Sequence, residues 1–200
     1  SGVPGDISSI VVMYVEREGK MVEHALNFIL ADYDFLDVMG MEIADGRNFS
    51  REMKTDVEEA VIINETAAKN LGWFDQAIGK RIDFGIDLEG NVSRPTKVIG
   101  VVKDFHYVSL HNVIDPLVIF LNDDPGYNMS IKTTGNSDNR AEEFIRDTWH
   151  SFNVKNPFSF YLLENKIDAE YISEEKLGRI FSYFTLISIL IALLGLFGLA

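Results

Sequence analysis

The charged residues of this 200-residue chain stop at Arg179, and everything after them is one uncharged, strongly apolar segment. The segment, residues 180–200, reads IFSYFTLISILIALLGLFGLA and contains no Asp, Glu, Lys, Arg, His, Asn, Gln or Pro. As a helix it would extend over about 31 Å, which matches a bilayer hydrocarbon core of about 30 Å. Apolar side chains would lie on every face of this helix, whereas helices of soluble domains carry a polar stripe. The sequence therefore predicts a transmembrane helix at 180–200.

The composition of the whole chain is that of a folded, acidic protein. Its hydrophobic fraction of 46% excludes intrinsic disorder as the main description. Eighteen Lys and Arg against 31 Asp and Glu give a net charge of -13, which repels phosphate backbones and anionic lipid headgroups. We therefore expect no nucleic-acid partner. The absence of cysteine excludes disulfides, thiolate zinc sites, iron–sulfur clusters and cysteine nucleophiles.

Both ends of the chain suggest a fragment of a longer membrane protein. It begins with Ser1 and Gly2 in place of Met, as after cleavage of a tag, and Ala200 lies inside the apolar segment. Lys176 and Arg179 flank this segment and weakly favour a cytoplasmic domain, although long domains translocate despite such charges. These two charges therefore do not decide on which side of the membrane the domain lies.

The pattern before residue 180 predicts an α+β fold with two lobes. One lobe repeats a strand and helix pattern in two distant segments, residues 6–58 and 127–178. Its strands are expected at 10–15, 25–30, 129–133 and 158–163, and its helices at 35–39 and 141–152. Residues 168–179 contain no breaker except Gly178, so they are expected to continue as one helix into the apolar segment.

The second lobe, residues 59–126, is predicted to be small and rich in β-structure. Val61–Ile63 is its first strand, and Asn64 follows as the N-cap of a short helix that ends at Gly72. Two further strands are expected at 80–84 and 97–102, joined by a polar turn that contains Gly and Pro.

One group of residues has obvious chemical potential: Asp104, His106, His111 and Asp115. Two imidazoles and two carboxylates could bind a divalent metal or act as an acid–base pair. However, the histidines are five residues apart, which would place them on different faces of a helix, and loop residues are the simpler interpretation. We therefore expect no catalytic, cofactor-binding or metal-binding residue and no cofactor. The aromatic side chains are expected in the core: Trp73, Phe74, Trp149, Phe158, Phe160 and Tyr161.

Four stretches of the chain occur in a distinctive order. They are GRNF at 46–49, VIINE at 61–65 followed by Gly79-Lys80, VIGVVKDFH at 98–106, and the closing apolar segment. Together they resemble the MacB/FtsX-type permeases of ABC transporters. The segment from Lys103 to His111 looks most like large bacterial permeases with two extracytoplasmic domains.

This resemblance implies a periplasmic core domain, with a discontinuous porter-like lobe at 6–58 and 127–178 and an inserted β-rich lobe at 59–126. Residues 1–179 would be extracytoplasmic, anchored in the bacterial inner membrane. The protein would not be an enzyme: a cytoplasmic ATP-binding subunit would hydrolyse ATP, and the permease would couple this to export or lipoprotein handling. Other permease helices or a second permease copy would be its partners in the membrane. A face for such packing is predicted from small residues at three- and four-residue steps: Ser188, Ala192, Gly195 and Gly198.

Two alternative functions remain open from the sequence. An extracytoplasmic ligand-sensing domain of a membrane signalling receptor would share the size, acidity and membrane exit, and would hold one aromatic-lined pocket. A membrane-anchored metal-dependent hydrolase would use His106 and His111. Further apolar spans after Ala200 would favour the permease, whereas a coiled linker and a kinase domain would favour the sensor. Stoichiometric bound metal would favour the hydrolase.

Overall fold

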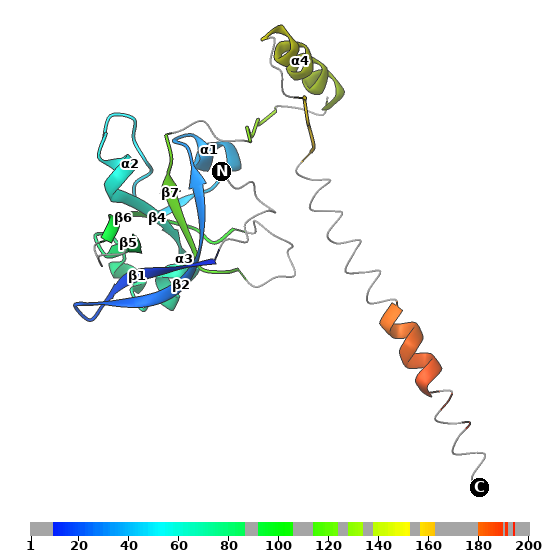
Figure 1. The fold of residues 1–200 in the computed structure, drawn as a ribbon, viewed down its shortest axis with the longest axis horizontal. Coiled ribbons are helices and arrows are strands. Elements are labelled where there is room, and N and C mark those ends of the chain that lie inside the picture. Colours follow the sequence, from blue (N-terminus) through cyan, green and yellow to red (C-terminus); the bar gives the residue numbers. More distant parts are fainter. Residues whose placement is uncertain are drawn as a thin grey trace. The chain divides into compact units, whose positions relative to one another are not determined.

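The structure is a computed structural model, and it forms two compact units, residues 1–147 and 148–200 (Figure 1). The residues that it describes are 10–86, 92–105, 114–123, 128–133, 138–152, 157–162, 180–189, 191 and 194.

The described elements follow one another as a mixture of strands and short helices. In chain order they are β1 (Ile10–Arg17), β2 (Lys20–Ala31), α1 (Phe35–Met39), β3 (Ile43–Gly46), α2 (Asp56–Glu59), β4 (Ala60–Asn64), α3 (Glu65–Asn70), the 3-10 turn η1 (Phe74–Gln76), β5 (Arg81–Ile86), β6 (Val92–Val102), β7 (Leu117–Leu121) and α4 (Asp138–Ser151). The mixed α+β class expected from the sequence is confirmed.

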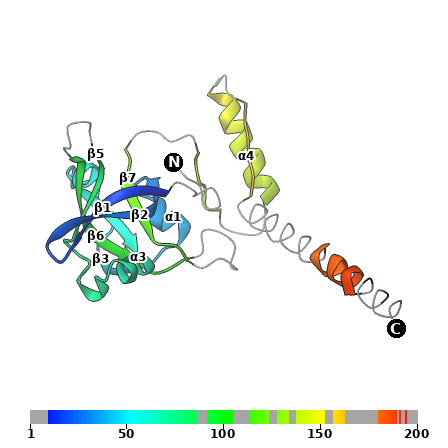
Figure 2. The ribbon, with the colours of Figure 1, turned by 60° about the horizontal axis from the view of Figure 1, so that its bottom comes forward.

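The strands form one sheet that closes on itself. Its order is β3-β6-β4-β7-β2-β1-β5, and β5 pairs in addition with β6. This last pairing closes β6, β4, β7, β2, β1 and β5 into a ring and leaves β3 attached to β6 (Figure 2). The long strand β6 serves three neighbours because its two halves pair differently. Residues 92–97 pair with β5, whereas residues 97–102 pair with β4 and, towards their end, with β3.

The central strands β4 and β7 are buried along their whole length, since both faces of the sheet are covered. Successive residues of each strand alternate between two core clusters. Val61 and Phe120 belong to one cluster, which α3 and Trp73 cover. Ile62 and Ile119 belong to the other cluster, to which α1 and Phe49 contribute. Burial of both faces explains why these strands are continuous apolar runs and lack an alternating pattern.

Most of the expected elements occur, but two expected strands are wrong. Residues 129–133 have no regular secondary structure, and neither do residues 158–162 of the segment expected as strand 158–163. A strand requires a neighbour for its N–H and C=O groups, and the described residues provide no such pairing for either segment. The side chain of Met129 is accordingly 83% exposed.

The ring combines strands from the two segments that the sequence assigns to different lobes. Strands β1 and β2 come from residues 6–58, and β4 to β7 come from residues 59–126. One sheet thus extends across the expected boundary near residue 59. The association of 6–58 with 127–178 in one lobe stays a prediction.

The second unit contains an aromatic cluster and part of the apolar segment. The rings of Trp149 and Phe158 lie 6.2 Å apart, and Phe158 stacks on Phe160 at 6.3 Å. Residues 180–189, 191 and 194 are helical, while the remainder of 180–200 and the expected helix at 168–179 lie outside the described residues. Among the residues that the structure describes, no helix has both the length and the hydropathy to cross a bilayer.

Candidate binding pocket

Asp104 binds the N-terminus of α3. Its carboxylate accepts hydrogen bonds from the backbone N–H of Thr66 at 2.8 Å and from the Thr66 hydroxyl at 2.9 Å. Lys69 Nζ lies 3.6 Å from the same carboxylate, and the N–H of Asp104 donates in return to Glu65. The helix N-terminus favours a negative charge at this position. Asp104 therefore joins the end of β6 to the start of α3.

No contact that the structure describes joins Asp104 to another member of the expected cluster. His106 and His111 lie outside the described residues. Asp115 is exposed, and its backbone carbonyl accepts a hydrogen bond from the Asn64 side chain at 2.9 Å. Within the part of the chain that the structure describes, no group of three or more His, Asp or Glu side chains could hold a metal ion.

Two glycines allow β3 to lie directly against β6. Gly46 pairs with Gly100, and the N–H of Arg47 donates to the carbonyl of Ile99 at 3.0 Å. A Cβ at Gly100 would lie 2.3 Å from the Arg47 carbonyl oxygen, and one at Gly46 would lie 2.3 Å from the Ile99 carbonyl oxygen. Only glycine fits this close backbone approach. Both residues belong to stretches that the sequence analysis singled out.

An ion pair between the half-exposed Arg47 and the buried Asp56 holds the loop that follows β3. Arg47 binds Asp56 through two hydrogen bonds of 2.7 Å, and the N–H of Ser50 donates to the same carboxylate at 3.0 Å. Asp56 is only 2% exposed. Burial by itself would raise the pKa of Asp56, but the hydrogen bonds from Arg47 and Ser50 outweigh it and lower that pKa. The same pair raises the pKa of Arg47.

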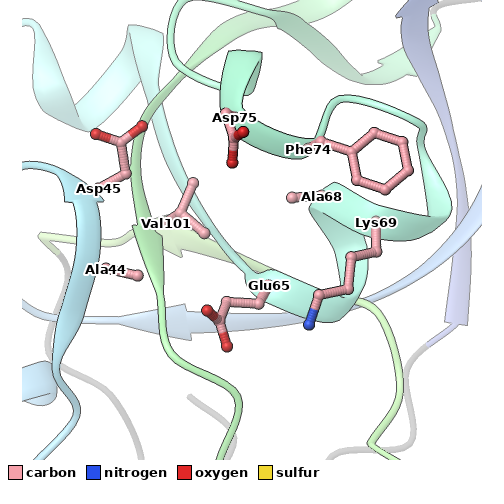
Figure 3. Close-up of a pocket in the computed structure, with 8 residues that line it drawn as sticks. All are labelled: Ala44, Asp45, Glu65, Ala68, Lys69, Phe74, Asp75 and Val101. Carbon is pink, nitrogen blue, oxygen red and sulfur yellow. The ribbon is translucent and has the colours of Figure 1, made fainter.

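An open pocket of about 410 Å³ lies between β3, β6, α3 and η1 (Figure 3). Ala44, Ala68 and Val101 form its apolar surface, and Ala68 and Val101 are themselves buried. The remaining lining residues are Asp45, Glu65, Lys69, Phe74 and Asp75. The N–H of Gly79 donates to the carbonyl of Val98 at 2.8 Å, which fixes the segment after η1 against β6.

The pocket residues were not found by sequence reasoning, because they come from four separate elements and share no motif. The expectation that both Trp73 and Phe74 lie in the core is wrong for Phe74, whose side chain is 68% exposed, whereas Trp73 is buried. Phe74 has a positive φ of 39°, so the backbone turns sharply between the two aromatic residues. Phe160 and Tyr161 are likewise exposed rather than core residues.

The closed sheet and its open, acidic pocket define an α+β domain with a surface site and with short helices packed on the sheet. The family model of the MacB-like periplasmic core domain matches residues 2–155. The chain belongs to this family, as the resemblance of its four stretches indicates.

The family assignment agrees with the fold of one solved structure. The periplasmic region of MacB from Actinobacillus actinomycetemcomitans has a TM-score of 0.54 and 19% identity, over 82% of this chain and 72% of that chain. A domain assigned to a permease of Porphyromonas gingivalis has a TM-score of 0.47 and 22% identity, over 72% and 66% of the two chains. The extracellular domain of the noncanonic ABC-type transporter YknZ from Gram-positive bacteria has a TM-score of 0.36 and 21% identity, over 56% and 51%. No curated protein matches the chain.

Proposed function

We propose that this chain is the extracytoplasmic domain of an ABC transporter permease, which couples ATP hydrolysis by a cytoplasmic partner subunit to export or lipoprotein handling outside the inner membrane. The observation that carries the proposal is the combination, in one chain, of the MacB-like periplasmic core domain at 2–155 with the uncharged segment at 180–200. In this assignment residues 180–200 are a transmembrane helix and residues 1–179 lie outside the cytoplasm.

The described part of the apolar segment supports a lipid environment. Residues 180–189 are helical and exposed, and Phe181, Phe184 and Ile187 are each more than half exposed. Burial of such side chains in hydrocarbon stabilises a helix by roughly 0.3 to 0.6 kcal/mol for each well-placed Leu, Ile or Phe. The porter-like lobe of 6–58 with 127–178 and the inserted lobe of 59–126 belong to the same proposal.

The absence of cysteine makes the topology directly testable. In the intact protein within bacterial inner membranes, with any cysteine outside residues 1–200 replaced by serine, Glu52→Cys would carry a single thiol at an exposed loop position whose side chain makes no described contact. A membrane-impermeant maleimide added to spheroplasts should label this variant. Ser188→Cys, inside the apolar segment, is the matched control and should stay unlabelled until detergent is added. Labelling of Glu52→Cys only after lysis would contradict the proposed topology.

Coupling to ATP hydrolysis requires a separate test. Deleting residues 10–123 from the intact permease should leave ATP binding by the partner subunit intact but abolish transport. The folded domain that would receive the motion driven by ATP hydrolysis is then missing. Unchanged transport by this deletion would contradict coupling through the domain. A saturable small-molecule stabilisation of the isolated domain would instead favour the ligand-sensing alternative.

A further inference from the structure

The hairpin formed by β1 and β2 extends beyond the closed sheet (Figure 1, Figure 2). Its two strands pair without a bulge along the whole of β1, from Ile10 to Arg17. Glu18 and Gly19 form the turn, and both have a positive φ, of 51° and 75°. A two-residue turn of this kind matches the twist of the strands that it joins, so the hairpin is a preformed element.

One edge of β2 is open along residues 20–26. Strand β7 pairs with β2 only from Asn27 to Ala31. Within the part of the chain that the structure describes, no strand pairs with residues 20–26 on the side away from β1. This part of β2 is therefore an edge strand, although the sheet as a whole is closed.

The alternation of hydrogen bonds in a hairpin identifies the backbone groups at this edge. With a two-residue turn, Arg17 and Lys20 form the first hydrogen-bonded pair, and every second residue of β2 after Lys20 also bonds β1. The N–H of Asn27 points the other way, since it donates to the carbonyl of Pro116 at 3.2 Å. By the same alternation, three residues direct their N–H and C=O groups to the open edge, where no described residue binds them: Met21, Glu23 and Ala25.

The open edge lacks the usual features that prevent another strand from pairing with it. Residues 20–26 contain no proline, and their pairing with β1 shows no bulge. Met21 and Val22 lie on opposite faces of the strand, and each is 36% exposed. A strand added at this edge would bury apolar surface on both faces and would bind the open backbone groups.

Charge disfavours a second copy of this chain as the added strand. Only one antiparallel register pairs the whole edge with itself, and it places Glu23 directly opposite the Glu23 of the other copy. Like charges in this position are destabilising. Each copy also has a net charge of -13, which adds repulsion between them. The same charges attract a basic segment.

We propose that the open edge of β2 binds an extended, basic segment of a protein partner by strand addition. In this binding mode main-chain hydrogen bonds give affinity, and alternate side chains give specificity. The hydroxyl of Tyr14 donates to one oxygen of Glu23 at 2.7 Å, and no described residue binds the other oxygen. A Lys or Arg of the added strand next to Glu23 would bind this second oxygen. The inference goes beyond the proposed function and does not depend on coupling to ATP hydrolysis.

The probe for this edge is the pentapeptide Val-Thr-Arg-Thr-Val with both ends blocked, titrated into the 200-residue chain in mild detergent and followed by NMR. In an added strand its arginine lies next to Glu23, and its valines lie next to Met21 and Ala25. The amide signals of these three residues should shift and saturate with a dissociation constant in the millimolar range. Their hydrogen exchange should slow at least about twofold at saturation.

Two altered peptides separate strand addition from attraction of charge alone. The peptide with every backbone nitrogen methylated keeps the side chains and the charge but cannot donate to β2, so it should bind at least about fivefold more weakly. The peptide with glutamate in place of arginine should bind about threefold more weakly or less well still, because it faces Glu23 with a like charge. Equal binding of the methylated peptide would overturn the proposal.

Two variants of the chain localise the binding. Ala25→Pro removes one N–H at the open edge and none that bonds β1, so it should weaken binding at least about fivefold. Glu23→Gln should weaken binding of the arginine peptide about two- to fivefold. Glu52→Gln, an exposed charge elsewhere, is the control and should leave the affinity unchanged.

Three further results would overturn the proposal. They are unchanged affinity for the arginine peptide in Glu23→Gln, unchanged affinity in a folded Ala25→Pro variant, and no saturation up to about 50 mM peptide. Slow hydrogen exchange at Met21, Glu23 and Ala25 before any peptide is added would also overturn it. The edge would then already be paired, either with another segment of this chain or with a second copy.

Discussion

The side-chain oxygen of Asn64 accepts a hydrogen bond from the backbone N–H of Leu117 at 3.0 Å. The same oxygen accepts from the N–H of Ala67 at 2.9 Å, and the amide nitrogen donates to the carbonyl of Asp115 at 2.9 Å. Asn64 is completely buried. One side chain therefore joins the end of β4, the first turn of α3 and the start of β7.

Replacing Asn64 by Ala should destabilise the domain by about 2–4 kcal/mol. The variant loses the cap of α3 and leaves the N–H of Leu117 buried without a partner. Urea unfolding followed by tryptophan fluorescence measures the change in unfolding free energy. Asn70→Ala is the control, since Asn70 is exposed at the end of α3, and it should change stability by less than about 0.5 kcal/mol. Equal losses of unfolding free energy for the two variants would show that the hydrogen bonds of Asn64 do not stabilise the domain.

The two roles of Asn64 also mark how far the sequence is informative. Its capping of α3 could be predicted, because a cap and the helix that it serves lie within a few residues of each other. Its bond to Leu117 could not, since the two residues are 53 positions apart and β7 itself was not expected. The pocket was missed for the same reason: Asp45 and Asp75 are distant in the sequence, and only the closed sheet and the α3–η1 segment bring them together. Contacts between residues close in sequence, such as a helix cap, can be predicted from one sequence, whereas contacts between distant strands cannot.

Replacing Gly100 by Ala should destabilise the domain by about 2–3 kcal/mol or more, because the added Cβ would lie 2.3 Å from the Arg47 carbonyl oxygen. Backbone cannot give way as a flexible side chain would, so β3 must shift away from β6. Gly72→Ala is the matched control: its φ is +74°, but a Cβ there would meet nothing within 4 Å. Gly72→Ala should lose only about 1–2 kcal/mol of unfolding free energy, which is the cost of a left-handed conformation for alanine. Thermal unfolding of both variants ranks them, and a Gly72→Ala variant less stable than Gly100→Ala would contradict the steric explanation.

Replacing Asp56 by Asn should cost about 2–3 kcal/mol of unfolding free energy. The substitution removes the charge that Arg47 binds through two hydrogen bonds, while Arg47 remains partly exposed and keeps some hydration. Arg51→Gln is the control, because it breaks the Arg51–Asp34 pair, in which both side chains are 64% exposed. Such exposed pairs contribute less than about 1 kcal/mol. If the two variants unfold at the same urea concentration, the burial of Asp56 in its pair with Arg47 has no energetic consequence.

The contribution of Asp56 should disappear in acid. Hydrogen bonds from Arg47 and Ser50 lower its pKa in the folded protein despite its burial, whereas an unfolded aspartate titrates near pH 3.9. The folded state therefore binds fewer protons at this site, so the stabilisation is fully present above about pH 5 and declines as the pH falls below about 4 towards the folded pKa.

Measuring unfolding free energies of the unaltered protein and Asp56→Asn from pH 7 to pH 3 tests this dependence, because the contributions of the other carboxylates cancel in the difference between the two proteins. The difference should be constant from pH 7 to about pH 5 and should shrink below about pH 4. A difference that stays the same down to pH 3 would mean that ionisation of Asp56 does not stabilise the loop after β3.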